Sequence, residues 1–204
     1  MNIASQPSSA GLRSPLPLGL ALFLLLFGAT FRVLRLEFLP TLPNFAPLMA
    51  IAICGAFVLP GRLAFIVPLS ALVATDLLLN VVYGVSLFNF SQIFIYACYG
   101  IGVATGLALH RRNAGTIPVF ASVAANSVLF YLVTNFFCWF GNAAYPQTAT
   151  GLMQALTVGL PGWPPTWTFL RNSLVSDLLF TGLFLGVIHL ATRSKRAELS
   201  LARA

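Results

Sequence analysis

Two carboxylates, Asp76 and Asp177, lie inside apolar runs that are long enough to cross a lipid bilayer. The chain has only four acidic residues in all. A charge at membrane depth is costly unless it is paired or faces water, so an intramembrane acid indicates a functional site. Three kinds of chemistry fit such a pair: binding of a ligand or ion, ion pairing with arginine to clamp helices, and the two-carboxylate chemistry of an intramembrane protease.

Each carboxylate belongs to a polar stripe at helical spacing. Asn80 follows Asp76 one turn later, and Thr181 follows Asp177 in the same way, so each pair shares a helix face. Two other apolar runs carry stripes made of Ser127, Tyr131, Asn135, Cys138 and Asn142, and of Gln92, Tyr96 and Tyr99. The polar faces of four helices therefore predict a shared site inside a bundle.

The composition indicates a membrane protein. Hydrophobic residues make up 58% of the chain and charged residues 7%, and the mean hydropathy is +0.90. We expect an all-α polytopic bundle of six transmembrane helices, at about 16–36, 46–60, 63–83, 88–110, 116–142 and 167–192. Residues 1–15 are expected to form a flexible cytoplasmic N-terminus and residues 193–204 a basic cytoplasmic tail. The stretch 148–160 is too short to span and is suited to covering an opening.

The basic residues predict the orientation of the bundle. If the N-terminus is inside, eight of the eleven Lys and Arg residues lie on the inner side, as the positive-inside rule requires. Both termini are then cytoplasmic, and we expect a multi-pass protein of the bacterial inner membrane. The basic residues are scattered over segment ends, which argues against nucleic acid as a partner.

Three arginines, Arg32, Arg35 and Arg171, break this rule because they lie near the outer ends of their helices. At 1.5 Å per residue, Asp76 and Asp177 lie roughly 11 to 15 Å below the outer ends, in the same half of the membrane. This asymmetry predicts a cavity that opens outward and is closed below. The candidate substrate-binding residues are Asp76, Asn80, Asn135, Arg171, Asn172 and Asp177, with Arg32 and Arg35 pairing an anionic group and Phe45 and Tyr96 as apolar cover. A clamp of Asp and Arg residues that only holds the helices together is the structural alternative.

The sequence carries none of the common catalytic or metal-binding motifs. The sequence has no H-E-x-x-H, P-loop or G-x-S-x-G motif, and Cys54, Cys98 and Cys138 lack the spacing of a metal site. The contexts Thr75-Asp76 and Ser176-Asp177 differ from the Y-D and G-x-G-D contexts of intramembrane aspartyl proteases, which stay a second alternative. We therefore predict a protein that is not an enzyme and has no cofactor or metal.

Two further patterns concern the packing of the bundle. Gly102 with Gly106, and Gly182 with Gly186, have the G-x-x-x-G spacing, which permits close helix contact within the bundle or in a homo-oligomer. The sequences TDLL at 75–78 and SDLL at 176–179 occupy matching places in two halves of three helices. Such a match is compatible with an inverted repeat, a transporter design that places the site between the halves.

The chain resembles an uncharacterised bacterial family of small membrane proteins proposed to act in transport. The resemblance covers about residues 30–190 and is carried by PNFAP at 43–47, PGR at 60–62, VPL at 67–69, DL at 76–77, YLVTNF at 131–136, Trp139, YP at 145–146, FLRNS at 169–173 and DLL at 177–179.

In size, helix number and cytoplasmic termini the chain is also similar to the S-components of energy-coupling factor vitamin transporters. That similarity implies uptake of a vitamin or related micronutrient, captured under the loop between helices one and two, here residues 37–47. It implies membrane lipid and a small-molecule substrate as partners, and an energy-coupling module where one is used. Helix one lacks the A-x-x-x-A stretch with which S-components dock that module, so a solitary carrier stays an alternative.

Overall fold

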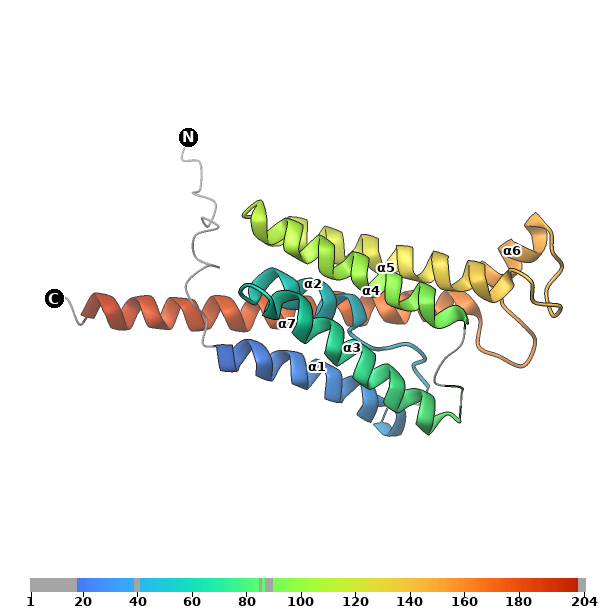
Figure 1. Cartoon of the computed structure of the whole chain (residues 1–204), viewed down its shortest axis with the longest axis horizontal. Helices are drawn as coiled ribbons and strands as arrows, with labels where there is room; N and C mark the ends of the chain where they lie inside the picture. The colour runs from blue at the N-terminus through green and yellow to red at the C-terminus, as the bar shows by residue number, and fades with distance from the viewer. Residues whose placement is uncertain (1–17, 39–40, 85, 87–89, 202–204) are drawn as a thin grey trace.

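The computed structural model describes residues 18–38, 41–84, 86 and 90–201, and the regular secondary structure of these residues is entirely helical (Figure 1). The helices are α1 (Leu18–Phe38), α2 (Leu48–Val58), α3 (Leu63–Val82), α4 (Phe90–Arg111), α5 (Thr116–Trp139), α6 (Ala149–Leu156) and α7 (Thr166–Leu201). The expected flexible segment 1–15 lies outside the described residues. α7 continues nine residues past the expected end at 192, through the stretch predicted as a tail.

Four of these helices are long and apolar enough to cross a membrane. They are α3, α4, α5 and the part Thr166–Ala191 of α7, with mean hydropathies of 1.6 to 2.0. α1 and α2 contribute shorter apolar stretches, Leu22–Leu34 and Leu48–Val58. Large apolar side chains such as Ile117 and Leu190 are exposed on the outside of the bundle. An apolar outer surface of this extent requires lipid around it, so these features indicate a membrane protein.

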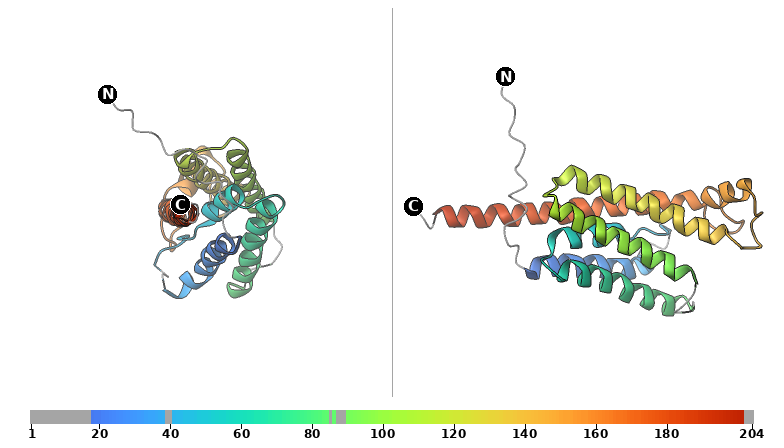
Figure 2. Two further views of the ribbon diagram at one scale, coloured as in Figure 1. Left: turned by 90° about the vertical axis from the view of Figure 1, so that its left-hand side faces the viewer. Right: turned by 45° about the horizontal axis from the view of Figure 1, so that its top comes forward.

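α2 is the central helix of the bundle. Ten of its eleven residues are buried, and it contacts α1, α3, α4, α5 and α7. The end-on view in Figure 2 shows α2 surrounded by the longer helices. A helix that is apolar on every side has no face to present to water, and here the other helices bury it on all sides.

The glycines of α4 explain how closely α4 packs on α2. A Cβ atom at Gly106 would overlap the carbonyl oxygen of Ile53, and one at Gly102 would lie 3.1 Å from the Cβ of Ala52. This G-x-x-x-G pair is therefore used inside the bundle rather than between copies of the chain. At Gly186 of the second pair an added Cβ would meet nothing within 4 Å.

The shortness of α2 shapes the interior. Eleven residues rise about 16 Å, roughly half of the hydrocarbon thickness of a bilayer. We use the name α6 end for the end of the bundle that holds α6 and the last residues of α3 and α5 (Figure 1). Residues 41–47 lead from α1 back into the bundle, where α2 begins well short of the α6 end and then runs to the opposite end. The space between the start of α2 and the α6 end is thus not filled by a helix.

Candidate functional site

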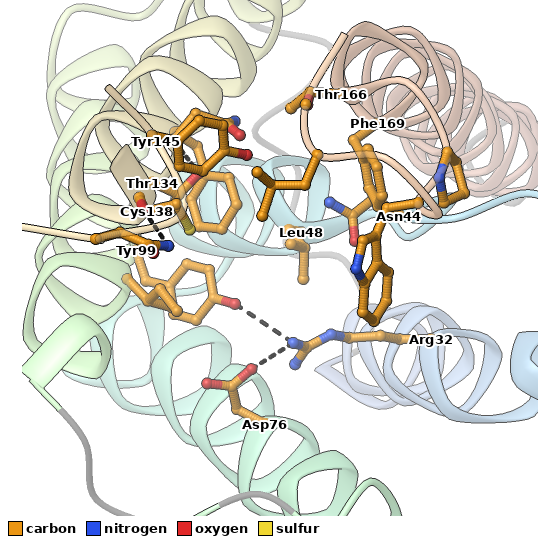
Figure 3. A pocket seen from close by; sticks show the side chains of 18 residues that line it. Arg32, Asn44, Leu48, Asp76, Tyr99, Thr134, Cys138, Tyr145, Thr166 and Phe169 are labelled. Atoms are coloured by element: carbon orange, nitrogen blue, oxygen red, sulfur yellow. Dashed lines mark hydrogen bonds and ion pairs between the residues drawn. The ribbon is translucent and has the colours of Figure 1, made fainter. Parts of the chain in front are cut away.

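A cavity of about 520 Å³ lies in this space (Figure 3). Leu48, the first residue of α2, lines it, and the other helices and the loops of the α6 end supply the walls. The lining residues are Arg32, Asn44, Leu48, Asp76, Ile95, Tyr99, Phe130, Thr134, Asn135, Cys138, Asn142, Tyr145, Gly159, Leu160, Trp163, Pro164, Thr166 and Phe169. Its volume falls in the range of roughly 300 to 1,000 Å³ found for small-molecule sites.

A buried ion pair forms one side of the cavity. Nη2 of Arg32 lies 2.6 Å from Oδ1 of Asp76, and the two residues are 6% and 8% exposed. Arg32 also donates to the carbonyl oxygen of Leu72 and to the hydroxyl groups of Thr75 and Tyr99. Figure 3 shows Arg32 of α1 and Asp76 of α3 pointing toward one another, with the Tyr99 hydroxyl directed at the guanidinium. The pair joins α1 to α3 and places a satisfied cation at the cavity wall.

The second carboxylate has a different role. Asp177 is 1% exposed, and its Oδ1 accepts hydrogen bonds from the backbone N–H groups of Met49 and Ala50 at 2.9 and 3.1 Å. Its Oδ2 accepts from the Ser127 hydroxyl at 2.6 Å. The first N–H groups of a helix have no partner within the helix, and α2 begins where water cannot supply one. Asp177 of α7 therefore caps the buried N-terminus of α2.

The walls of the cavity are aromatic, with oxygen acceptors along α5. The rings of Tyr99 and Phe130 stack with centroids 5.8 Å apart. The Thr134 hydroxyl donates to the carbonyl oxygen of Phe130, and the Asn135 amide nitrogen donates to that of Tyr131. These polar side chains thus satisfy carbonyl groups of their own helix while their oxygen atoms stay available as acceptors.

α6 and the loop after it cover the α6 end of the cavity. The Tyr131 hydroxyl donates to the carbonyl oxygen of Leu156, the last residue of α6, and the backbone N–H of Trp167 donates to the carbonyl oxygen of Thr157 at 3.0 Å. Gln154 of α6 bonds the carbonyl oxygen of Gly159 at 3.0 Å. These bonds hold the loop so that Gly159, Leu160, Trp163 and Pro164 line the cavity.

Three of the predicted site residues line this cavity together: Arg32, Asp76 and Asn135. Asp177 does not belong to the described lining, because it is committed to α2. Asn80 is half-buried one turn beyond Asp76, and its Nδ2 is buried without a hydrogen-bond partner among the described residues.

The other predicted residues lie near the cavity without lining it. The Asn172 amide donates to the carbonyl oxygen of Pro43 at 2.9 Å and accepts from Arg171, so it ties α7 to the loop before α2. Phe45 packs against Phe31, and Tyr96 packs against Tyr99. The guanidinium of Arg171 lies over the ring of Trp167. The Arg35 side chain is outside the described part of the chain.

Sequence reasoning missed several lining residues. Cys138 and Asn142 belong to the predicted polar stripe but were left out of the predicted site, and Phe130 and Thr134 precede Cys138 at intervals of four residues, so this spacing could have identified the face of α5 that lines the cavity. Leu48 could not be identified in this way, because its place at the cavity depends on where α2 begins in space.

A protein-family model matches most of the chain. Residues 15–199 match the model of a protein family described as Family of unknown function (DUF6580). No curated protein and no solved structure matches the chain.

Proposed function

This chain belongs to the family of unknown function DUF6580, and we propose that it binds a small molecule in the cavity at the α6 end and takes part in its uptake across a membrane. The observation that carries the proposal is a cavity of about 520 Å³ with a buried Arg32–Asp76 pair in its wall. Such a cavity, mostly apolar with a few convergent polar groups, is typical of ligand sites. Helix packing alone does not require it, because a full-length central helix would fill the space.

The proposed orientation places the cavity on the outer side of the bacterial inner membrane. Four exposed arginines, Arg62, Arg111, Arg112 and Arg193, lie in the segments at the end of the bundle opposite α6. The positive-inside rule favours that end as the cytoplasmic one. In this proposal the chain makes six crossings, with both termini in the cytoplasm: five are the helices α1, α3, α4, α5 and α7, and one is the segment 41–58, which consists of the loop before α2 and α2 itself.

The resemblance to S-components of vitamin transporters supports uptake as the purpose of binding. Those proteins capture their substrate under the loop between the first two helices, and here Asn44 of that loop lines the cavity. We propose a vitamin or related micronutrient as the substrate, and either an energy-coupling module or a second copy of the chain as the partner.

A structural role as a helix clamp is the second candidate. The cap that Asp177 forms on α2 favours it, since this carboxylate serves packing alone. The clamp does not account for the aromatic cavity. An aspartyl enzyme needs two carboxylates that share a site, whereas Asp76 is paired with Arg32 and Asp177 with α2.

Native mass spectrometry of the protein purified in mild detergent tests the binding proposal. We expect a small molecule to co-purify with the unchanged protein and with Asp177→Asn, and to be lost from Asp76→Asn. Each variant replaces a buried carboxyl group by an amide, at Asp76 in the cavity lining and at Asp177 outside it. Equal retention by both variants would contradict binding in this cavity.

A further inference from the structure

The charges that line the cavity balance each other. Among the eighteen lining residues only Arg32 and Asp76 carry a full charge, and they are paired at 2.6 Å. A ligand with a net charge would lose its hydration in this cavity and find no unpaired counter-charge there. The charge balance therefore favours an uncharged ligand.

The hydrogen bonds of Arg32 are already used. Its Nη1 donates to Leu72 and Thr75, and its Nη2 donates to Asp76 and, at 3.4 Å, to Tyr99. These bonds account for four of the five N–H donors of a guanidinium. Arg32 therefore cannot bind a carboxylate or phosphate through two parallel hydrogen bonds, which is how arginine binds such anions.

Asp76, unlike Arg32, has a hydrogen-bonding atom that is not used. Its Oδ1 receives Arg32, but its Oδ2 is buried and has no hydrogen-bond partner among the described residues. A buried carboxylate oxygen without a partner is unusual and costly. Because Oδ2 is buried, the carboxylate must turn toward the cavity to meet a ligand, and a new hydrogen bond from a donor would favour that turn.

The α5 wall also supplies acceptors, beside the second N–H of the Asn135 amide. Thr134 and Asn135 each donate a hydrogen to their own helix, and their oxygen atoms can accept one from a ligand. The stacked rings of Tyr99 and Phe130, together with Phe169, supply flat apolar surface in the cavity wall. The cavity therefore offers acceptors and aromatic faces rather than free cations.

We infer that the cavity selects an uncharged, planar nitrogen heterocycle that directs an N–H group at Oδ2 of Asp76. This inference rests on the proposed function, and it reverses the expectation from sequence that Arg32 pairs an anionic group. It assigns Asp76 as the residue that determines specificity, and Arg32 as the residue that orients it.

Four matched probes test the inference on the unchanged protein at neutral pH. They are benzimidazole, which is neutral with one N–H donor; 1-methylbenzimidazole, which lacks that donor; benzimidazole-5-carboxylate, an anion; and benzamidine, a planar cation. Equilibrium dialysis against protein-free micelles of the same detergent removes the contribution of partition into the micelle. We expect benzimidazole to bind about tenfold more tightly than its methylated form, the effect of one hydrogen bond, and more tightly than either charged probe.

The variant Asp76→Asn adds an internal control. It should bring the ratio of the affinities for benzimidazole and 1-methylbenzimidazole close to one, since only the first probe donates a hydrogen bond to the carboxylate and both probes meet the same change in the Arg32 pair. Preference for the anion or the cation, or equal binding of benzimidazole and its methylated form, would overturn the inference while leaving a ligand site in place. Failure of all four probes to bind, with no co-purifying small molecule, would overturn the proposed function itself.

Discussion

Replacing Asp177 tests whether this buried carboxylate serves the structure or the ligand. In Asp177→Ala the N–H groups of Met49 and Ala50 lose their acceptor at the buried start of α2. Asp177→Asn keeps an oxygen in the place of Oδ1, so both backbone groups stay bonded. The two substitutions therefore separate the loss of an acceptor from the loss of a charge.

The expected cost follows from the groups left unpaired. Each buried N–H without a partner costs about 1 to 3 kcal/mol, so the two together cost about 4 kcal/mol. The Ser127 hydroxyl adds little, because it also lies 3.0 Å from the carbonyl oxygen of Val123 and can donate there. Asp177→Asn should change the stability by less than about 1 kcal/mol, since weaker neutral hydrogen bonds are offset by the smaller cost of burying an uncharged group.

Thermal unfolding in detergent, followed by tryptophan fluorescence at one scan rate, measures these effects. A loss of about 4 kcal/mol lowers the Tm of a chain of this size by roughly 10 °C. The matched control is Ser176→Ala, which removes a neighbouring buried hydroxyl that has no partner among the described residues and should leave the Tm unchanged. An equal fall of the Tm in Asp177→Asn and Asp177→Ala would refute the capping role and show that the negative charge itself is required.

Two further predictions concern packing and orientation. Gly106→Ala should destabilise the protein by about 1 to 3 kcal/mol, because the added Cβ overlaps the carbonyl oxygen of Ile53. Gly186→Ala should be neutral or slightly stabilising, because the added Cβ meets nothing within 4 Å. Thermal unfolding curves of the two variants measure the difference. In a cysteine-free background, Ala143→Cys should react with an impermeant maleimide on intact cells and Arg112→Cys only after permeabilisation, since the two exposed positions lie at opposite ends of the bundle. The reverse labelling pattern would show that the cavity faces the cytoplasm.

Much of the helical layout follows from local properties of the sequence. The runs predicted at 63–83 and 116–142 correspond to α3 (Leu63–Val82) and α5 (Thr116–Trp139), because apolar length and flanking glycines and prolines are local signals. The extension of α7 past 192 was missed. Residues 193–201 contain no glycine or proline, so nothing in that stretch ends the helix, and its charge alone suggested a tail.

The roles of the two carboxylates could not be predicted in the same way. The stretches TDLL at 75–78 and SDLL at 176–179 are nearly identical, yet Asp76 meets an arginine of α1 and Asp177 meets the backbone of α2. The difference lies in the neighbouring helices, and no spacing within α3 or α7 encodes it. Sequence patterns located both acids on polar faces, whereas their partners depend on tertiary packing.

The half-length of α2 links these two carboxylates. A central helix that starts deep in the bundle leaves a cavity between its first residue and the α6 end, and the same start buries N–H groups that have no partner within the helix. Asp177 satisfies those groups and so makes the short helix stable. Asp76 lies in the wall of the space that the short helix leaves open. The cap is therefore a condition for the cavity, and loss of Asp177 should affect a ligand only through the position of Leu48, whereas loss of Asp76 should affect it directly.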